Sequence, residues 1–333
     1  MRMVPMFITV RHRRRGPAIR TVGGLAAVAL LAGCGVTVQT TAGFAADSPS
    51  TLRVATSLYP LEFLAAEVGG DRVEVVNLTP AGAEPHDLEL APTDVLTLGQ
   101  ADLVLALPGF QPAIDDALAH LGADAAVGTT PAVLDVTGPA RLLGLDQEDE
   151  HEHGHDDGHD HGMAGADPHF WLDPLRLAGV AGAVADALAG LDPAGTADYE
   201  RNAAALTTRL TALDAQYTAG LAECERRTIV TSHQSFGYLG ERYDLTEVSV
   251  SGLDPEGEPA PVRIHEIATA VAGTGATTVF TEPLTPPKAA RVLGAELGIS
   301  VALLDPIETR PDGGYLAAAH RNLSALRTAL GCS

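Results

Sequence analysis

Apolar runs alternate with helical patterns along the first half of the chain. Three runs rich in valine and leucine predict strands, at residues 51–57, 72–78 and 101–107. Helical patterns lie after and between them, at residues 61–68, 92–100 and 111–121. Short buried strands that are separated by helices are typical of a parallel sheet. Residues 51–191 are therefore expected to form an N-terminal α/β lobe.

The same alternation returns toward the end of the chain. Strands are expected at residues 227–232, 245–250, 277–282 and 300–304. Helices are expected at residues 236–243, 261–273, 286–298 and 315–330. The pattern over residues 225–333 therefore predicts a second α/β lobe, with a parallel sheet flanked by helices as in the first.

A long helical pattern separates the two halves. Its apolar positions recur at helical spacing, at Leu206, Leu210, Leu213, Tyr217 and Leu221. Asp192 and Pro193 suit the N-cap and the first helical position. A helix over residues 192–224 would be about 45 Å long at 1.5 Å per residue. We expect it to form a rigid connection between the lobes.

The first residues have the features of an export signal. A basic stretch at 11–20 precedes an apolar run at 22–33 that is too short to span a bilayer. The run ends in LAG directly before Cys34, which resembles a bacterial lipobox, where the cysteine is acylated after residues 1–33 are removed. An ordinary signal peptide or a lone membrane anchor is the alternative. Residues 34–50 are small and polar, as expected of a flexible tether.

The charge of the chain limits its partners. The whole chain has a formal net charge of −22, and residues 1–33 hold six of its 21 basic residues and no acidic residue. The remainder has 15 basic and 43 acidic residues, a formal charge of −28. We do not expect so acidic a body to bind nucleic acid or an anionic membrane surface through charge. Solubility outside the cell would explain most of this charge.

Two cysteines follow Cys34, at positions 224 and 332. An exported protein meets an oxidising environment, so this pair predicts a disulfide between Cys224 and Cys332. Two unreactive thiols are the alternative. A thiolate metal site is disfavoured because neither cysteine lies in a paired ligand motif.

Residues 147–165 interrupt the pattern of strands and helices. The segment combines carboxylates with five histidines, His151, His153, His155, His159 and His161. It cannot bury apolar surface, so we expect a mobile loop. The loop is a solvated acidic linker, a weak, multi-site trap for zinc, or a sensor of zinc abundance.

Four side chains stand far apart and could together bind a metal ion: His86, His169, His233 and Asp305. Three imidazoles and one carboxylate make a tetrahedral set for Zn²⁺. His233 and Asp305 come just after predicted strands, and His86 lies in a loop after another. Open parallel sheets bind ligands at that edge. Each residue could, on its own, be an ordinary loop or core residue.

The segments around these residues resemble the cluster A-I metal-binding proteins of ABC transporters, the zinc and manganese solute-binding lipoproteins. The matching segments are EPH at 84–86, DPHFWLDP at 167–174, TSHQSFGYL at 231–239, SGLDPEGEPAP at 251–261, FTEP at 280–283 and LDP at 304–306. They occur in order over nearly the whole chain after the tether. DPHFWLDP is long and specific, and the ordered set is more specific than any one motif.

The resemblance implies two α/β lobes joined by one rigid helix, with Zn²⁺ held between them. His86 and His169 would come from the first lobe, and His233 and Asp305 from the second. Manganese-type members carry Glu where this chain has His233, and nitrogen ligands favour Zn²⁺. At the fourth position zinc members use either a carboxylate or water. Glu84 and Glu282 match recurrent acidic positions, where they either hold imidazole N–H groups or face solvent.

The implied function is capture of Zn²⁺ by a lipid-anchored monomer on the outer face of the cell membrane. The protein would deliver the ion to an ABC permease driven by a cytoplasmic ATPase, and the chain itself has no P-loop. A Mn²⁺ or Fe²⁺ transport component is the nearest alternative. A secreted zinc hydrolase is another, but four protein ligands would close the position that catalytic zinc keeps for water. The residues do not favour an adhesin, a label that some relatives carry.

Overall fold

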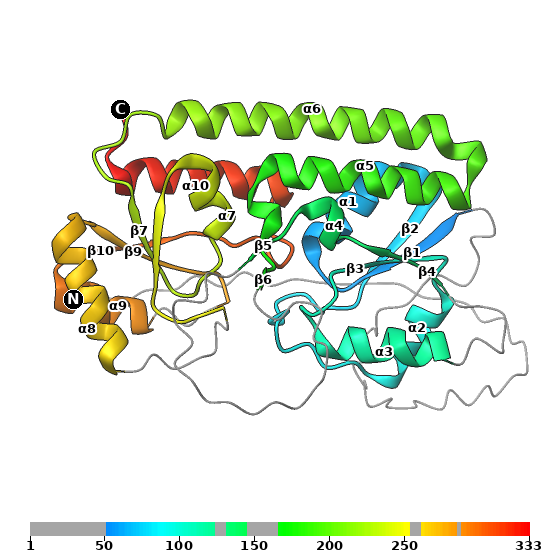
Figure 1. Ribbon diagram of the computed structural model, residues 1–333, viewed down its shortest axis with the longest axis horizontal. Helices are drawn as coiled ribbons and strands as arrows, with labels where there is room; N and C mark the ends of the chain where they lie inside the picture. Colours follow the sequence, from blue (N-terminus) through cyan, green and yellow to red (C-terminus); the bar gives the residue numbers. More distant parts are fainter. Residues whose placement is uncertain (1–50, 124–130, 145–165, 254–260, 285–287) are drawn as a thin grey trace, which may run out of the picture. The chain divides into compact units, whose positions relative to one another are not determined.

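The chain forms two four-stranded sheets that follow each other along the sequence (Figure 1). The structure is a computed structural model, and it describes residues 51–123, 131–144, 166–253, 261–284 and 288–333. Every strand pair within these two sheets is parallel. The prediction of an α/β fold with two parallel sheets is confirmed. The export signal, Cys34, the tether and the histidine-rich segment 147–165 lie outside the described residues.

The first sheet has the strand order β2-β1-β3-β4. Its strands are β1 (Leu52–Thr56), β2 (Val73–Asn77), β3 (Leu103–Ala106) and β4 (Ala132–Asp135). The helices of this lobe are α1 (Tyr59–Gly69), the 3₁₀ helix η1 (Gly70–Arg72), α2 (Pro92–Gln100), α3 (Pro112–Ala123) and α4 (Thr137–Ala140). One face of the sheet packs against α2 and α3 through a small core that includes Ala55, Val104 and Ile114. The sequence pattern missed β4, whose residues are mostly exposed at the sheet edge.

The second sheet has the strand order β10-β9-β7-β8. Its strands are β7 (Thr228–Thr231), β8 (Thr246–Ser249), β9 (Thr278–Thr281) and β10 (Ser300–Leu303). Its helices are α7 (Gly237–Tyr243), α8 (Pro261–Thr274), α9 (Lys288–Leu297) and α10 (Gly314–Leu330). A second small core, which includes Val230, Ile267 and Val279, lies between this sheet and helices α8 and α9. All the predicted elements of this lobe are present, with ends shifted by a few residues.

Two long helices, rather than one, connect the sheets. Helix α5 (Pro174–Leu191) was not predicted, and it runs beside α6 (Thr196–Gly220) (Figure 1). The 3₁₀ helix η5 (Pro193–Gly195) separates them, so the long helix begins at Thr196 and not at Asp192. Helix α6 contacts α1 of the first lobe and α10 of the second. Its 25 residues span about 37 Å.

The two lobes share one hydrophobic core. It joins Leu103 and Leu105 of the first sheet, Ile229 and Phe280 of the second, and apolar side chains of α5, α6 and α10. Among the described helices only α5 has the length and composition to cross a membrane, but its apolar residues, Val180 among them, belong to this core. Because protein interiors are close-packed, a shared core restricts how far the lobes can separate.

The two cysteines after Cys34 meet near the end of α6. Cys224 and Cys332 form an isolated antiparallel bridge, with their Cα atoms 3.9 Å apart and their sulfur atoms side by side. They are separated by 108 positions in sequence. The two residues that the sequence pairs are therefore neighbours in the fold.

Candidate metal centre

His86 lies in the loop between β2 and α2. The side-chain amide of Gln111, from the start of α3, donates to the carbonyl oxygen of Pro85 at 2.8 Å, which anchors the loop directly before His86. The edge of the His86 ring packs against Phe110, with ring centroids 4.7 Å apart. The backbone N–H of His86 donates to Oε1 of Glu84 at 3.3 Å. These contacts leave the His86 side chain 14% exposed.

His169 is held by the other residues of the DPHFWLDP segment. Asp167 ends the short strand β6 (Ala166–Asp167), which pairs with β5 (Leu143–Gly144). Oδ1 of Asp167 accepts from both the backbone N–H of His169, at 2.9 Å, and its ring Nδ1, at 2.7 Å. The 3₁₀ helix η4 (Phe170–Leu172) buries its three side chains, and Asp173 caps α5 by accepting from Leu175 at 2.8 Å. The segment thus fixes a fully buried imidazole between a carboxylate and the core.

His233 lies just beyond β7, in the segment that leads to α7. Its ring Nδ1 donates to Oε2 of Glu282 at 2.6 Å. A second, half-buried carboxylate, Glu247 of β8, accepts from the backbone N–H groups of Ser235 and Phe236 at 3.2 and 3.1 Å. The same carboxylate accepts from the Thr231 hydroxyl at 2.7 Å. Glu247 therefore holds both ends of the turn that carries His233.

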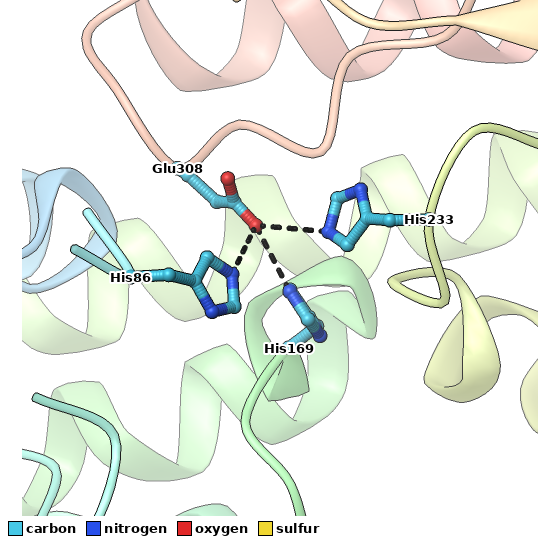
Figure 2. Close-up of side chains that lie close together, drawn as sticks. All are labelled: His86, His169, His233 and Glu308. Atoms are coloured by element: carbon cyan, nitrogen blue, oxygen red, sulfur yellow. Dashed lines mark hydrogen bonds and ion pairs between the residues drawn. The ribbon is translucent and has the colours of Figure 1, made fainter. Parts of the chain in front are cut away.

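The three histidines meet a fourth side chain, Glu308 (Figure 2). Oε1 of Glu308 lies 2.9 Å from Nε2 of His169, 3.4 Å from Nε2 of His86 and 3.5 Å from Nε2 of His233. One atom from each of the four residues falls within 4.8 Å of all the others. The centre therefore presents three imidazole nitrogens and a carboxylate oxygen to one point.

Asp305 lies outside this cluster, although the sequence pointed to it as the fourth ligand. Its Oδ1 accepts from the backbone N–H of Ile307 at 2.8 Å. The rule that ligands follow strand ends selects the first polar residue after β10. The chain instead turns once more at Ile307, which has a φ of 58°. The carboxylate in the cluster is that of Glu308, three positions after Asp305. The signal for Glu308 was present in the sequence, as the second carboxylate of LDPIE.

The electrostatics of the centre favour positive charge. Burial alone would lower the pKa of His169 and His233, but the neighbouring carboxylates outweigh it. Asp167 and Glu308 raise the pKa of His169 to about 9, and Glu282 and Glu308 raise that of His233 to about 10. Burial would raise the pKa of Glu308, yet hydrogen bonds from the histidines hold it well below its usual range. The site therefore stabilises cations, whether protons or a metal ion.

The nitrogen and oxygen donors of the centre suit a divalent metal ion of intermediate softness, such as Zn²⁺. Asp167 and Glu282 bind the Nδ1 atoms of His169 and His233, so both rings turn Nε2 toward the common point. This is how protein metal sites fix the tautomer and the orientation of their imidazoles. Nε2 of His233 is buried, and within the described part of the chain it pairs with Oε1 of Glu308 only at the longer distance of 3.5 Å. Three nitrogens and one oxygen in this arrangement match a tetrahedral Zn²⁺ site.

The acidic positions expected behind the ligands have separate roles. Glu282 binds the ring of His233, and Glu84 binds the backbone of His86. Burial, and then the charge of Glu308, raise the pKa of Glu84 to about 7. A small pocket beside the centre is lined by Glu84, Glu282, Asp305 and Glu308, among others. The supporting carboxylates Asp167 and Glu247 were not expected from the sequence, although Asp167 belongs to the DPHFWLDP segment.

Comparison with known proteins agrees with this geometry. A family described as "Zinc-uptake complex component A periplasmic" matches residues 54–329. The chain belongs to this family. The resemblance to zinc-type solute-binding proteins that the motifs indicated is thereby confirmed, and the family is not one of enzymes.

Individual relatives carry zinc in their names. The zinc-binding lipoprotein AdcA of Streptococcus pneumoniae serotype 4 is 31% identical over 286 residues, covering 83% of this chain and 55% of AdcA. The chain thus spans about half the length of this relative. The high-affinity zinc uptake system protein ZnuA of Bacillus subtilis is 28% identical over 308 residues, covering 90% of this chain and 94% of ZnuA.

Solved structures of the family have the same fold. Zn(II)-bound AdcA of Streptococcus pneumoniae superposes with a TM-score of 0.69 at 27% identity, over 84% of this chain and 58% of AdcA. The laminin-binding protein Lmb of Streptococcus agalactiae, described as an adhesin with metal-transporting activity, gives a TM-score of 0.70 at 28% identity, over 84% and 99% of the two chains. The two-lobed architecture is therefore that of the family.

Proposed function

We propose that this protein captures Zn²⁺ between its two lobes and delivers it to an ABC permease for import. The ligands are Nε2 of His86, His169 and His233, and Oε1 of Glu308. The observation that carries the proposal is the convergence of these four atoms within 4.8 Å, in a buried centre whose carboxylates favour a cation. Relatives named for zinc binding and zinc uptake support the choice of ion.

The nitrogen content of the site supports Zn²⁺ over Mn²⁺ or Fe²⁺. Three imidazoles and one carboxylate oxygen suit Zn²⁺, whereas Mn²⁺ prefers more oxygen ligands. Four protein ligands also close the coordination sphere, which is typical of sites that hold zinc rather than use it in catalysis. A hydrolytic role would need an open position for water. Capture and transport therefore fit the donor set better than hydrolysis.

The remaining features fit a protein that works outside the cytoplasm. We propose that residues 1–33 direct export, that Cys34 carries the lipid anchor, and that Cys224 and Cys332 form a disulfide in the oxidising environment. The protein acts as a monomer on the outer face of the membrane, and its partners are the permease and the cytoplasmic ATPase. The five histidines of segment 147–165 serve as a weaker, accessory zinc site.

Release of the ion requires only a modest movement of the lobes. The shared core and the contacts of α6 with both lobes oppose a wide hinge. The ring N–H of Trp171 in the first lobe also donates to the carbonyl oxygen of Pro306 in the second, at 2.7 Å. Small movements of packed elements are a known mode of opening. We propose that docking on the permease separates the ligands by such a movement.

Metal content and coordination test the proposal directly. The protein purified without chelators is expected to retain one tightly bound Zn²⁺, and X-ray absorption should show three imidazoles and one carboxylate. Deletion of residues 147–165 should leave this ion in place. His233→Ala should weaken binding strongly, whereas His265→Ala, which removes an exposed imidazole on α8, should not. The absence of a tightly bound ion, or a shell made mostly of oxygen, would contradict the proposed site.

Transport needs a separate measurement in cells. Cells that lack this protein are expected to take up less Zn²⁺ at limiting external concentration, and the unmodified gene should restore uptake. The His233→Ala variant should fail to restore it. If His233→Ala restores uptake fully, the centre described here does not supply the transported ion.

A further inference from the structure

The carboxylate of Asp305 faces the backbone of its own loop. Its Oδ1 accepts from the N–H of Ile307, two residues on, at 2.8 Å. This closes an Asx turn, in which a side-chain oxygen replaces a backbone carbonyl. The contact lies directly before Glu308, the one carboxylate in the metal centre.

Ile307 has an unusual backbone conformation. Its φ is 58°, in the left-handed region, and its side chain is only 1% exposed. A β-branched residue rarely adopts this region, because its side chain crowds the backbone. The surrounding structure must therefore hold Ile307 in place. The hydrogen bond from the Ile307 N–H to the Asp305 carboxylate contributes to this support.

Residues from both lobes form hydrogen bonds with the backbone of the loop at residues 305–308. Asn322 of α10 is buried and bonds both backbone groups of Asp305: its Oδ1 accepts from the N–H at 2.9 Å, and its Nδ2 donates to the carbonyl at 2.6 Å. The carbonyl oxygen of Glu308 accepts from the N–H of Tyr59, in α1, at 3.3 Å. The backbone on either side of Ile307 is therefore fixed, and the direction of the Glu308 side chain depends on the turn between.

We propose that Asp305 is a positioning residue, which together with Asn322 maintains the left-handed turn at Ile307 and so aims Glu308 at the three imidazoles. This rests on the proposed function, in which Glu308 is a zinc ligand. The role requires an acceptor oxygen at position 305 but no negative charge. Asparagine supplies such an oxygen, and asparagine also closes Asx turns. A direct ligand role for Asp305 would require the carboxylate itself, so the two roles predict different effects of Asp305→Asn.

The test compares five variants of the full chain. Zn²⁺ affinity is measured by competition with a chelator, and the absorption spectrum of bound Co²⁺ reports coordination. Asp305→Ala is expected to lower Zn²⁺ affinity about 10- to 100-fold, the usual effect of losing a residue that orients a ligand, and to alter the Co²⁺ spectrum. Asp305→Asn should retain the affinity and the spectrum of the unmodified protein. Asp312→Ala, which removes an exposed carboxylate from the same loop, is the matched control.

The Glu308→Gln variant tests the ligand role of Glu308 separately from the positioning role of Asp305. If Glu308→Gln binds Zn²⁺ as tightly as the unmodified protein, Glu308 is not a ligand and the proposed coordination is wrong. If Glu308→Gln weakens binding but Asp305→Ala does not, only the positioning role is overturned. Equal losses in Asp305→Asn and Asp305→Ala would also overturn it, because they would show that the charge is needed.

A variant that fails to fold would not end the test. Asn322→Ala removes the second support of the loop and should shift the Co²⁺ spectrum in the same direction as Asp305→Ala. Far-UV circular dichroism of each metal-free variant confirms folding. If Asp305→Ala does not fold, Asp305→Asn and Asn322→Ala decide: an unchanged spectrum in Asn322→Ala or a changed one in Asp305→Asn overturns the proposal.

Discussion

The Nδ1 atom of His233 lies 2.6 Å from Oε2 of Glu282, a carboxylate at the end of the neighbouring strand. The other oxygen of Glu282 accepts from the hydroxyl of Ser232 at 2.9 Å. One buried side chain after β9 therefore fixes both the ring and the preceding residue in the loop after β7. Parallel strands that end at one edge of a sheet bring such pairs together.

Glu282→Gln is expected to weaken Zn²⁺ binding about 10- to 100-fold, because the ring of His233 loses the charged acceptor that orients it. Competition with a chelator measures the loss. Glu296→Gln, which changes an exposed carboxylate on α9, is the matched control and should bind normally. An unchanged affinity in Glu282→Gln would show that the ring is oriented by other contacts.

Zinc affinity should depend on pH well above the range of an ordinary imidazole. In the metal-free protein the pKa of His169 is about 9 and that of His233 about 10. The ion must displace the protons on Nε2, so apparent affinity should rise as the pH approaches that range. Below it, each unit by which the pH is lowered should reduce the affinity about tenfold for each proton released. Calorimetry in buffers of different ionisation enthalpy should detect about two protons released near pH 7.5. Histidines with an unperturbed pKa would show almost no release there.

The stability of the metal-free protein should change with pH in the opposite sense. The folded-state pKa values of His169 and His233 lie above the unfolded value of about 6.5. Their contribution to folding stability is therefore complete below about pH 6.5 and is lost as the pH rises through about 9 to 10. The thermal midpoint of the metal-free protein should fall between pH 7 and pH 10. A midpoint that rises over this interval would contradict the direction of both shifts.

Gly237→Ala should weaken Zn²⁺ binding without contact with the ion. A Cβ atom at Gly237 would lie 2.7 Å from Oδ2 of Asp167, the carboxylate that binds the ring of His169. The added methyl group must displace Asp167, and we expect a loss of about tenfold or more in affinity. The control is Gly182→Ala on α5, where a Cβ would meet nothing within 4 Å. Equal affinities for the two variants would show that Asp167 yields without disturbing His169.

Replacing both Cys224 and Cys332 by serine should lower the free energy of unfolding by about 2–5 kcal/mol. A link between residues 108 positions apart restricts the unfolded chain strongly. Denaturant unfolding measures the change, and thiol labelling of the unfolded, unreduced protein should modify neither Cys224 nor Cys332. Zn²⁺ affinity should stay the same, since neither cysteine takes part in the metal centre. Two free thiols in the native chain would refute the disulfide.

The centre of each sheet could be predicted because its inner strands are largely buried. Strands such as β1 and β3 appear in the sequence as short apolar runs between helices. β4, a short edge strand with mostly exposed residues, was missed, whereas the equally exposed edge strand β10 was predicted. The start of α6 was placed four residues early, because Asp192 and Pro193 suit a helix start but lead instead into a 3₁₀ turn.

The three histidines could be found from their flanking sequences, but the fourth member of the centre could not. Asp305 and Glu308 are both carboxylates just beyond β10, and the left-handed residue Ile307 lies between them, directly before the one that reaches the imidazoles. A positive φ at a β-branched residue contradicts local preference, so sequence reasoning does not anticipate it. Likewise, Asp167 and Glu247 act through contacts that only the folded chain brings about.

Carboxylates on both sides of His169 and His233 also determine what loading does to the charge of the protein interior. Because the carboxylates raise the pKa of both histidines above neutral pH, the proposed Zn²⁺ would replace two protons, and the exchange would be electroneutral at the buried centre. The carboxylates that balance the ion are already desolvated and paired in the empty protein. Loaded and empty forms would then differ little in surface potential, and the proposed membrane partner would have to distinguish them by a change in shape.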